Sequence, residues 1–160
     1  MSVPRASDTE IKLMQLQVSE ALVKLGDDEN VQSIRAALYP SRPEELEATA
    51  LAVQILGQVR DKGSSGAMIH LAETKDAAGR PLPAEIRLGI AAALAKLGSP
   101  QGGFIADEFV AIVAAEAYKD IKAYENDDSL SQEDKMRNIN ALRNIVNELE
   151  EKLRNLRYRV

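Results

Sequence analysis

Cysteine and tryptophan are absent from the 160-residue chain, and histidine occurs only once. Without cysteine the chain has no disulfide, no thiolate metal site, no iron–sulfur cluster and no thiol nucleophile. A single histidine leaves no His-rich metal site and no easily built His-based triad. These absences count against the commonest catalytic and metal centres, so we expect a protein that is not an enzyme and that binds neither a metal nor a cofactor.

Long apolar runs are also missing. No stretch reaches the length of a membrane span. The first ten residues, MSVPRASDTE, lack the apolar segment of a signal peptide. We therefore expect a cytoplasmic protein, with an exported mature form that has lost its signal as the alternative.

Charge is unevenly distributed along the chain. Residues 1–134 carry a net charge of −9 and residues 135–160 carry +4, which gives −5 overall. An acidic body repels phosphate, so generic nucleic-acid binding by residues 1–134 is disfavoured. Aromatic residues, which would stack on bases, make up only 4% of the chain.

Internal repetition indicates the fold. Each repeat has an Ala- and Leu-rich helix, a short polar turn and a second helix, and no segment alternates with the period of a strand. The turns begin at Leu25, Val59 and Leu97, which are 34 and 38 residues apart, and this is the period of a helical-pair repeat. The three repeats span residues 10–38, 44–73 and 84–109.

Local signals set the expected helix ends. Glycine at positions 26 and 98 suits a left-handed helix terminus. Capping boxes are expected where Ser7 precedes Glu10 and where Ser41 precedes Glu44. The expected helices lie near residues 8–25, 29–38, 43–60, 65–75, 83–97, 103–124 and 131–157.

The apolar positions of the first helices predict the core. In the first repeat the helix offers Leu13, Leu16 or Gln17, Glu20 or Ala21, and Val23 or Leu25. In the third repeat the stripe is Ile86, Ile90, Ala93, Leu94 and Leu97. Because no single pair can bury such wide faces alone, the pattern favours stacked pairs.

The last part of the chain departs from the repeat. Residues 103–124 form a helix about twice the usual length, with apolar residues on two faces. The final helix carries a heptad pattern, called the seam below, with apolar residues spaced alternately by three and four. Its members are Ile139, Leu142, Val146, Leu149, Leu153, Leu156 and Val160.

The stretches EALVKLGDDENVQSIRAAL and AALAKLGSPQGGFIADEF resemble HEAT repeats of the bacterial type labelled phycobilisome-lyase-like. The turn Leu25-Gly26-Asp27 matches the family pattern fully, and Leu97-Gly98-Ser99-Pro100 matches it nearly. The middle repeat departs from the pattern, with Val59-Arg60-Asp61 in that place. The resemblance covers roughly residues 8–110 and is specific for fold rather than function, because these repeats serve many partners.

We therefore expect an all-α fold, a short α-solenoid of about three HEAT-like helical pairs closed by a long C-terminal helical hairpin. Residues 1–103 form the repeats, and residues 104–160 form a hairpin cap that belongs to the same structural unit. Packing of the seam on helix 103–124 predicts a monomer, and a dimer through residues 139–160 is the alternative.

The expected function is non-catalytic protein binding, as an adaptor, a scaffold or a structural subunit of a larger assembly. The resemblance implies that the second helices form the partner surface. Its candidate residues are Gln32, Arg35, His70, Glu73, Asp107 and Glu108. Two other classes stay open: a phycobilin lyase-like or other enzyme-associated HEAT protein, and a nucleic-acid-binding HEAT-like protein.

Overall fold

The computed structural model describes residues 5–158, with the side chains of residues 5–151, 154 and 155. Within this range the fold is all-α, and its only β-pairing is an isolated bridge between Lys75 and Pro81. The helices match the expected ones to within a few residues, and short 3-10 turns precede α2, α3 and α4. The bounds are α1 (Asp8–Lys24), α2 (Val31–Ala36), α3 (Leu46–Gln58), α4 (Ser65–Glu73), α5 (Ala84–Lys96), α6 (Gln101–Glu125) and α7 (Gln132–Tyr158).

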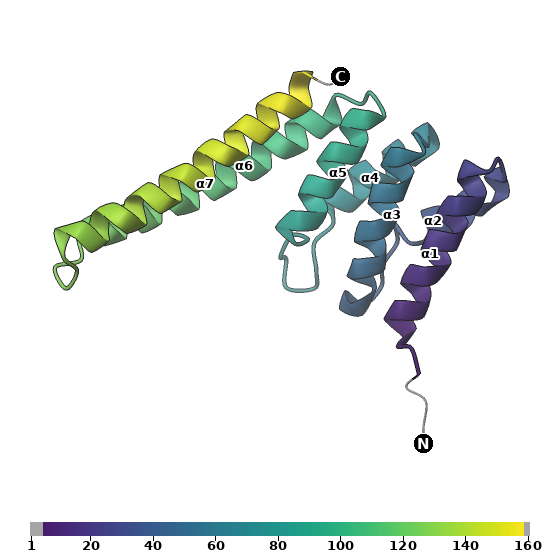
Figure 1. The fold of residues 1–160 in the computed structure, drawn as a ribbon, viewed down its shortest axis with the longest axis horizontal. Coiled ribbons are helices and arrows are strands. Elements are labelled where there is room, and N and C mark those ends of the chain that lie inside the picture. The colour runs from purple at the N-terminus through teal and green to yellow at the C-terminus, as the bar shows by residue number, and fades with distance from the viewer. Residues whose placement is uncertain (1–4, 159–160) are drawn as a thin grey trace.

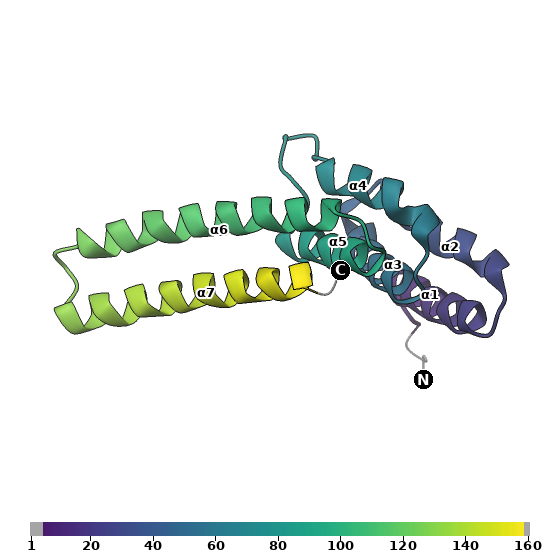
Figure 2. The same cartoon turned by 90° about the horizontal axis from the view of Figure 1, so that it is seen from above.

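The first helices of the three pairs form one layer. In Figure 1, α1, α3 and α5 lie side by side, with α3 in contact with both of its neighbours. Figure 2 shows α2 and α4 together on one side of this layer. The layer therefore has two ends, one at α1 and one at α5.

The turn inside each pair has the same backbone geometry. The second residue after the helix has a left-handed conformation in all three turns, with φ of 100° at Gly26, 56° at Arg60 and 75° at Gly98. The next N–H then donates to a carbonyl five residues back, which closes the helix end. These hydrogen bonds are Asp27 to Leu22 at 2.9 Å, Asp61 to Leu56 at 3.0 Å and Ser99 to Leu94 at 2.9 Å.

Spacings of 34 and 38 residues also align the second helices. They place Ile34, Met68 and Ala106 at equivalent positions, and each of these side chains is buried. Three helices of different sequence thus use the same position to contact the core. The repetition predicted from the sequence is present in both the turns and the burial.

Burial follows the expected stripe in the third pair and selects among the open alternatives in the first. All five residues of the predicted stripe on α5 are buried. On α1 the buried residue is Leu16 rather than Gln17, and Leu13 and Val23 pack against the core. Ala21 and Leu25 are exposed instead, because α3 packs on a different side of α1.

The C-terminal hairpin consists of α6 and α7 packed along each other. α6 begins as the second helix of the third pair and continues without a break, so residues 103 and 104 lie within one helix. Its first part packs on α5, whereas the rest projects away from the layer with α7 (Figures 1 and 2). The hairpin thus covers the α5 end with its base and forms a two-helix arm beyond it.

The seam of α7 faces α6 within the same chain. Ile139 is buried, and Leu142, Val146 and Leu149 are half-buried. The side chains of Leu153 and Leu156, and the residue Val160, lie outside the described part of the chain.

One predicted capping box is confirmed in part and the other is wrong. Ser7 precedes α1, and its Oγ accepts a hydrogen bond of 3.1 Å from the Glu10 N–H. At the second site the Ser41 N–H donates to Glu45 at 2.7 Å, rather than to Glu44. The 3-10 turn at Pro43–Glu45 explains the shift, because it brings the side chain of Glu45 back toward residue 41.

Candidate protein-binding surfaces

The repeat alignment places the six predicted binding residues in rows across the second helices. His70 and Glu108 are equivalent positions on α4 and α6. Arg35 and Asp107 are also equivalent to each other, in a different row. The six residues therefore do not share one environment, and their partners within the chain differ.

Arg35 forms an ion pair that links two helical pairs. Its guanidinium donates two hydrogen bonds to the Asp61 carboxylate, from Nε at 2.7 Å and from Nη2 at 2.6 Å. The two residues are 26 positions apart, so this bidentate ion pair ties α2 to the turn of the second pair. Arg35 therefore contributes to the packing of the stack, and its polar atoms are largely occupied.

The Asp61 carboxylate is held in its charged form. The hydrogen bonds from Arg35 lower its pKa below the ordinary value, in opposition to partial burial, which raises it. The Ser64 hydroxyl donates a further hydrogen bond to Asp61 and lowers the pKa as well. Ser64 is itself buried, and its hydrogen bond helps to hold the Asp61 carboxylate in place for the ion pair with Arg35.

Glu108 and Asp107 also have partners within the chain. An oxygen of Glu108 lies 3.2 Å from Nη2 of Arg87, a buried arginine on α5. Nε of Arg87 is buried and has no hydrogen-bond partner among the described residues. Asp107 is half-buried and interacts within the chain. The pair between Arg87 and Glu108 joins α5 to α6 at the base of the hairpin.

The other three predicted residues are available to a partner. Gln32, His70 and Glu73 are all exposed. Among residues 5–158 their side chains form no hydrogen bond or ion pair within the chain. They project from the outer sides of α2 and α4, whose inner sides carry the buried residues Ile34 and Met68.

Two exposed aromatic residues align in sequence with predicted ones and were not predicted, one in the bend that follows α2 and one in the first turn of α6. Tyr39 is 66% exposed and occupies the position equivalent to Glu73, whereas Phe104 is 64% exposed and is equivalent to Gln32. The repeat alignment together with the scarcity of aromatics could have identified both. We call Gln32, Tyr39, His70, Glu73 and Phe104 the second-helix face.

A second surface lies on α1 at the open end of the layer. Apolar residues that are exposed recur along this helix with alternating spacings of three and four. We call them the α1 stripe, and Leu25 is 83% exposed at its end. This spacing was visible in the sequence, but the choice of which face of α1 was buried was not. The members are Ile11, Met14, Val18, Ala21 and Leu25.

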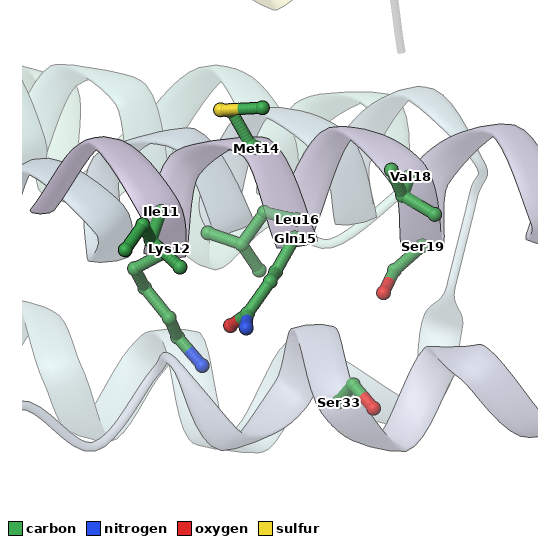
Figure 3. Close-up of a pocket in the computed structure, with 8 residues that line it drawn as sticks. All are labelled: Ile11, Lys12, Met14, Gln15, Leu16, Val18, Ser19 and Ser33. Carbon is green, nitrogen blue, oxygen red and sulfur yellow. The ribbon is translucent and has the colours of Figure 1, made fainter. Parts of the chain in front are cut away.

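A groove of about 570 Å³ runs beside the α1 stripe, between α1 and α2. Figure 3 shows Gln15 and Ser19 pointing toward α2, which contributes Ser33, whereas Met14 points away from it. The groove is an open surface feature with an apolar margin at Ile11 and Val18. This arrangement suits side chains of a partner rather than an enclosed small molecule.

Two other kinds of feature are absent from residues 5–158. No group of three or more His, Cys, Asp or Glu side chains in this part of the chain is arranged to hold a metal ion. None of its helices combines the length and apolar character needed to cross a bilayer. Comparison of the chain with protein-family models, curated proteins and solved structures finds no match.

Proposed function

We propose that this chain is a non-catalytic protein-binding module, acting as an adaptor, a scaffold or a structural subunit of a larger assembly. Its partner binds the second-helix face. The proposal includes membership of the three helical pairs in the HEAT-repeat family, which is supported by the recurrent left-handed turn and by the aligned burial of Ile34, Met68 and Ala106.

The exposure of Tyr39 and Phe104 carries the proposal. Aromatic residues make up only 4% of the chain, and a buried aromatic side chain stabilises a core strongly. Both residues are nevertheless about two-thirds exposed, Tyr39 in the bend that follows α2 and Phe104 in the first turn of α6. Aromatic side chains are enriched among the residues that contribute most to protein interfaces.

The polar residues of the face complete this pattern. Gln32, His70 and Glu73 have uncommitted side chains that can form hydrogen bonds with a partner. A typical interface combines apolar anchors with a polar rim that remains partly hydrated. The second-helix face contains both kinds of residue on a scaffold whose inner side is packed.

Affinity capture from the source cells tests this proposal. The full chain is compared with the double variant Tyr39→Ala/Phe104→Ala, using mass identification of bound proteins. Tyr118→Ala is the matched control, because Tyr118 is also an aromatic 64% exposed, but on the arm. We expect the double variant to lose the captured partner at least tenfold, on the order of two interface hot spots, and the control to retain it.

Unchanged capture by the double variant would contradict the proposed face. Equal loss in the control would place the partner on the arm instead. Circular dichroism of each variant establishes that the helices are intact, which is expected because all three aromatic side chains are exposed.

A further inference from the structure

The α1 stripe occupies the end of the layer that no helix among residues 5–158 covers. α3 lies on one side of α1, and Figure 1 shows no helix from the described part of the chain on the other side. Met14 and Val18, in the middle of the stripe, are 60% and 59% exposed. A continuous apolar stripe of this kind on a helix is typical of an interaction surface.

The charged and polar residues beside the α1 stripe indicate what kind of partner would bind it. Along one flank of α1, Glu10, Gln17 and Lys24 recur at intervals of seven residues. The acidic member lies in the first turn of the helix and the basic member in the last. Lys24 also contacts Glu20 within the chain, with Nζ 2.7 Å from Oε1, and its side chain remains largely exposed. The flank is thus negative at one end, neutral in the middle and positive at the other.

We propose that the α1 stripe binds the α1 stripe of a second copy of this chain, with the two helices antiparallel. Antiparallel packing places the flank of one helix along the same flank of the other, in reversed order. Glu10 of each copy then lies beside Lys24 of its partner, and Gln17 lies beside Gln17. The charge pattern of α1 is therefore complementary to itself.

The apolar positions fit the same register. With Glu10 beside Lys24, Met14 of one copy lies opposite Val18 of the other, and Ile11 lies opposite Ala21. The large residue Met14 thus meets a medium one, and the large Ile11 meets a small one. Parallel pairing would instead bring Glu10 next to Gln15 and would form no ion pair along this flank. Charge therefore selects the antiparallel arrangement.

Symmetry connects this pairing to the second-helix face. An antiparallel pair within one layer is related by a two-fold axis perpendicular to that layer, and such an interface closes after two copies. Because this rotation preserves each side of the layer, α2 and α4 of both copies lie on the same side. The dimer presents two second-helix faces in one direction, so a multivalent partner could bind both.

The expected dimer is weak. α1 has 17 residues and is therefore about 25 Å long, and a single helix pair of this length lies at the small end of specific interfaces. We expect dissociation in the micromolar range. The sequence predicted a monomer because the seam of α7 would pack on α6, as it does. The α1 stripe is a separate surface that this prediction did not include.

Sedimentation of the full chain over a concentration series, from about 1 to about 500 µM, is the primary test. We expect a monomer–dimer equilibrium in the wild type. Met14→Asp should raise the dissociation constant at least tenfold. Met136→Asp on the arm is the matched control, because Met136 is 53% exposed, and should leave the constant within twofold.

The orientation is tested by charge exchange. Glu10→Lys should weaken dimerisation, since two lysines would then face each other, and the double variant Glu10→Lys/Lys24→Glu should restore it. A natural absence of cysteine allows a second measurement. Gln17→Cys should form a disulfide-linked dimer under mild oxidation, whereas Tyr118→Cys should not.

Several outcomes would overturn the proposal. A wild-type chain that stays monomeric throughout the series would contradict pairing of the stripe with a second copy. Loss of the dimer in Met136→Asp but not in Met14→Asp would place the interface on the arm. Failure of the double charge exchange to restore dimerisation would exclude the antiparallel register. The second-helix face is not altered in any of these variants, so its test is independent.

Discussion

The two ends of the helical layer differ in how they are covered. At one end α5 is packed between α3 and α6, and its central residues Ile90 and Leu94 are fully buried. At the other end α1 is packed only on its inner side, and Val18 and Leu25 remain exposed. Both helices are apolar on two sides, so the difference comes from the helices that neighbour them in the chain.

The ends of a stack of helical pairs need covering in a way that its middle does not. A pair in the middle is covered on both sides by its neighbours, and a pair at the end needs a cap. Here the extended α6 provides the cap at α5, whereas among residues 5–158 no helix plays that role at α1. An uncovered end with an intact apolar stripe is a surface available for assembly.

The largest expected difference between the two ends is in their tolerance of a charge. Leu94→Asp would bury an unpaired carboxylate at the covered end and should lower the free energy of unfolding by about 4 kcal/mol or more. Val18→Asp at the open end should change it by less than about 0.5 kcal/mol. Urea denaturation measures both, with Glu73→Ala as an exposed control. Equal shifts for Leu94→Asp and Glu73→Ala would mean that the helix phase of α5 is wrong.

Two neighbouring glycines test the closeness of the cap at the covered end. A Cβ on Gly102 would lie 2.6 Å from the Ala91 carbonyl oxygen and 3.0 Å from the Ala95 nitrogen, both in the backbone of α5. A Cβ on Gly103 would meet nothing within 4 Å. Gly102→Ala should therefore destabilise the protein by about 3 kcal/mol, because α6 must move away from α5.

Gly103→Ala should be neutral or stabilise the protein by up to about 1 kcal/mol through helix propensity. Thermal melting of the two variants gives the comparison directly. Similar melting temperatures for both would contradict the close approach of α6 to α5.

The arm provides a test of whether the seam is used within the chain. Leu149 is half-buried on the helix that packs along α6, so Leu149→Lys should lower stability by about 2 kcal/mol through lost apolar burial. It should leave the fraction of dimer unchanged at a given concentration, in contrast to Met14→Asp. A folded Leu149→Lys monomer from a dimeric wild type would instead make the seam an intermolecular interface.

The smallest expected effect concerns the bridge that ties the open end to the rest of the layer. Because the pKa of Asp61 is lowered on folding, its contribution to stability is present above its unfolded value of 3.8 and is lost as the pH falls through the folded value. Asp61→Asn should therefore reduce the loss of unfolding free energy that occurs as the pH falls below 4. Denaturation curves at a series of pH values measure this change, and an unaltered pH dependence would contradict the role of Arg35.

Local sequence patterns were sufficient to predict the helices, most of their ends and the repeat. These features depend on short-range periodicity and on glycine at positions 26 and 98, where a left-handed turn carries little steric cost. The same local reasoning identified the buried stripe of α5, because its large apolar residues recur at helical spacing and alanines widen the same face. It also placed Gln32, His70 and Glu73 on exposed sides of their helices.

The long-range partners of the predicted residues depend instead on how the helices pack. Arg35 meets Asp61 from another pair, and Glu108 meets Arg87 across the hairpin base, because packing brings distant segments together. α1 has two apolar sides of similar character, so its periodicity alone does not select the side that α3 covers. Which stripe is buried depends on where the neighbouring helix packs, and that is a property of the whole stack rather than of the helix.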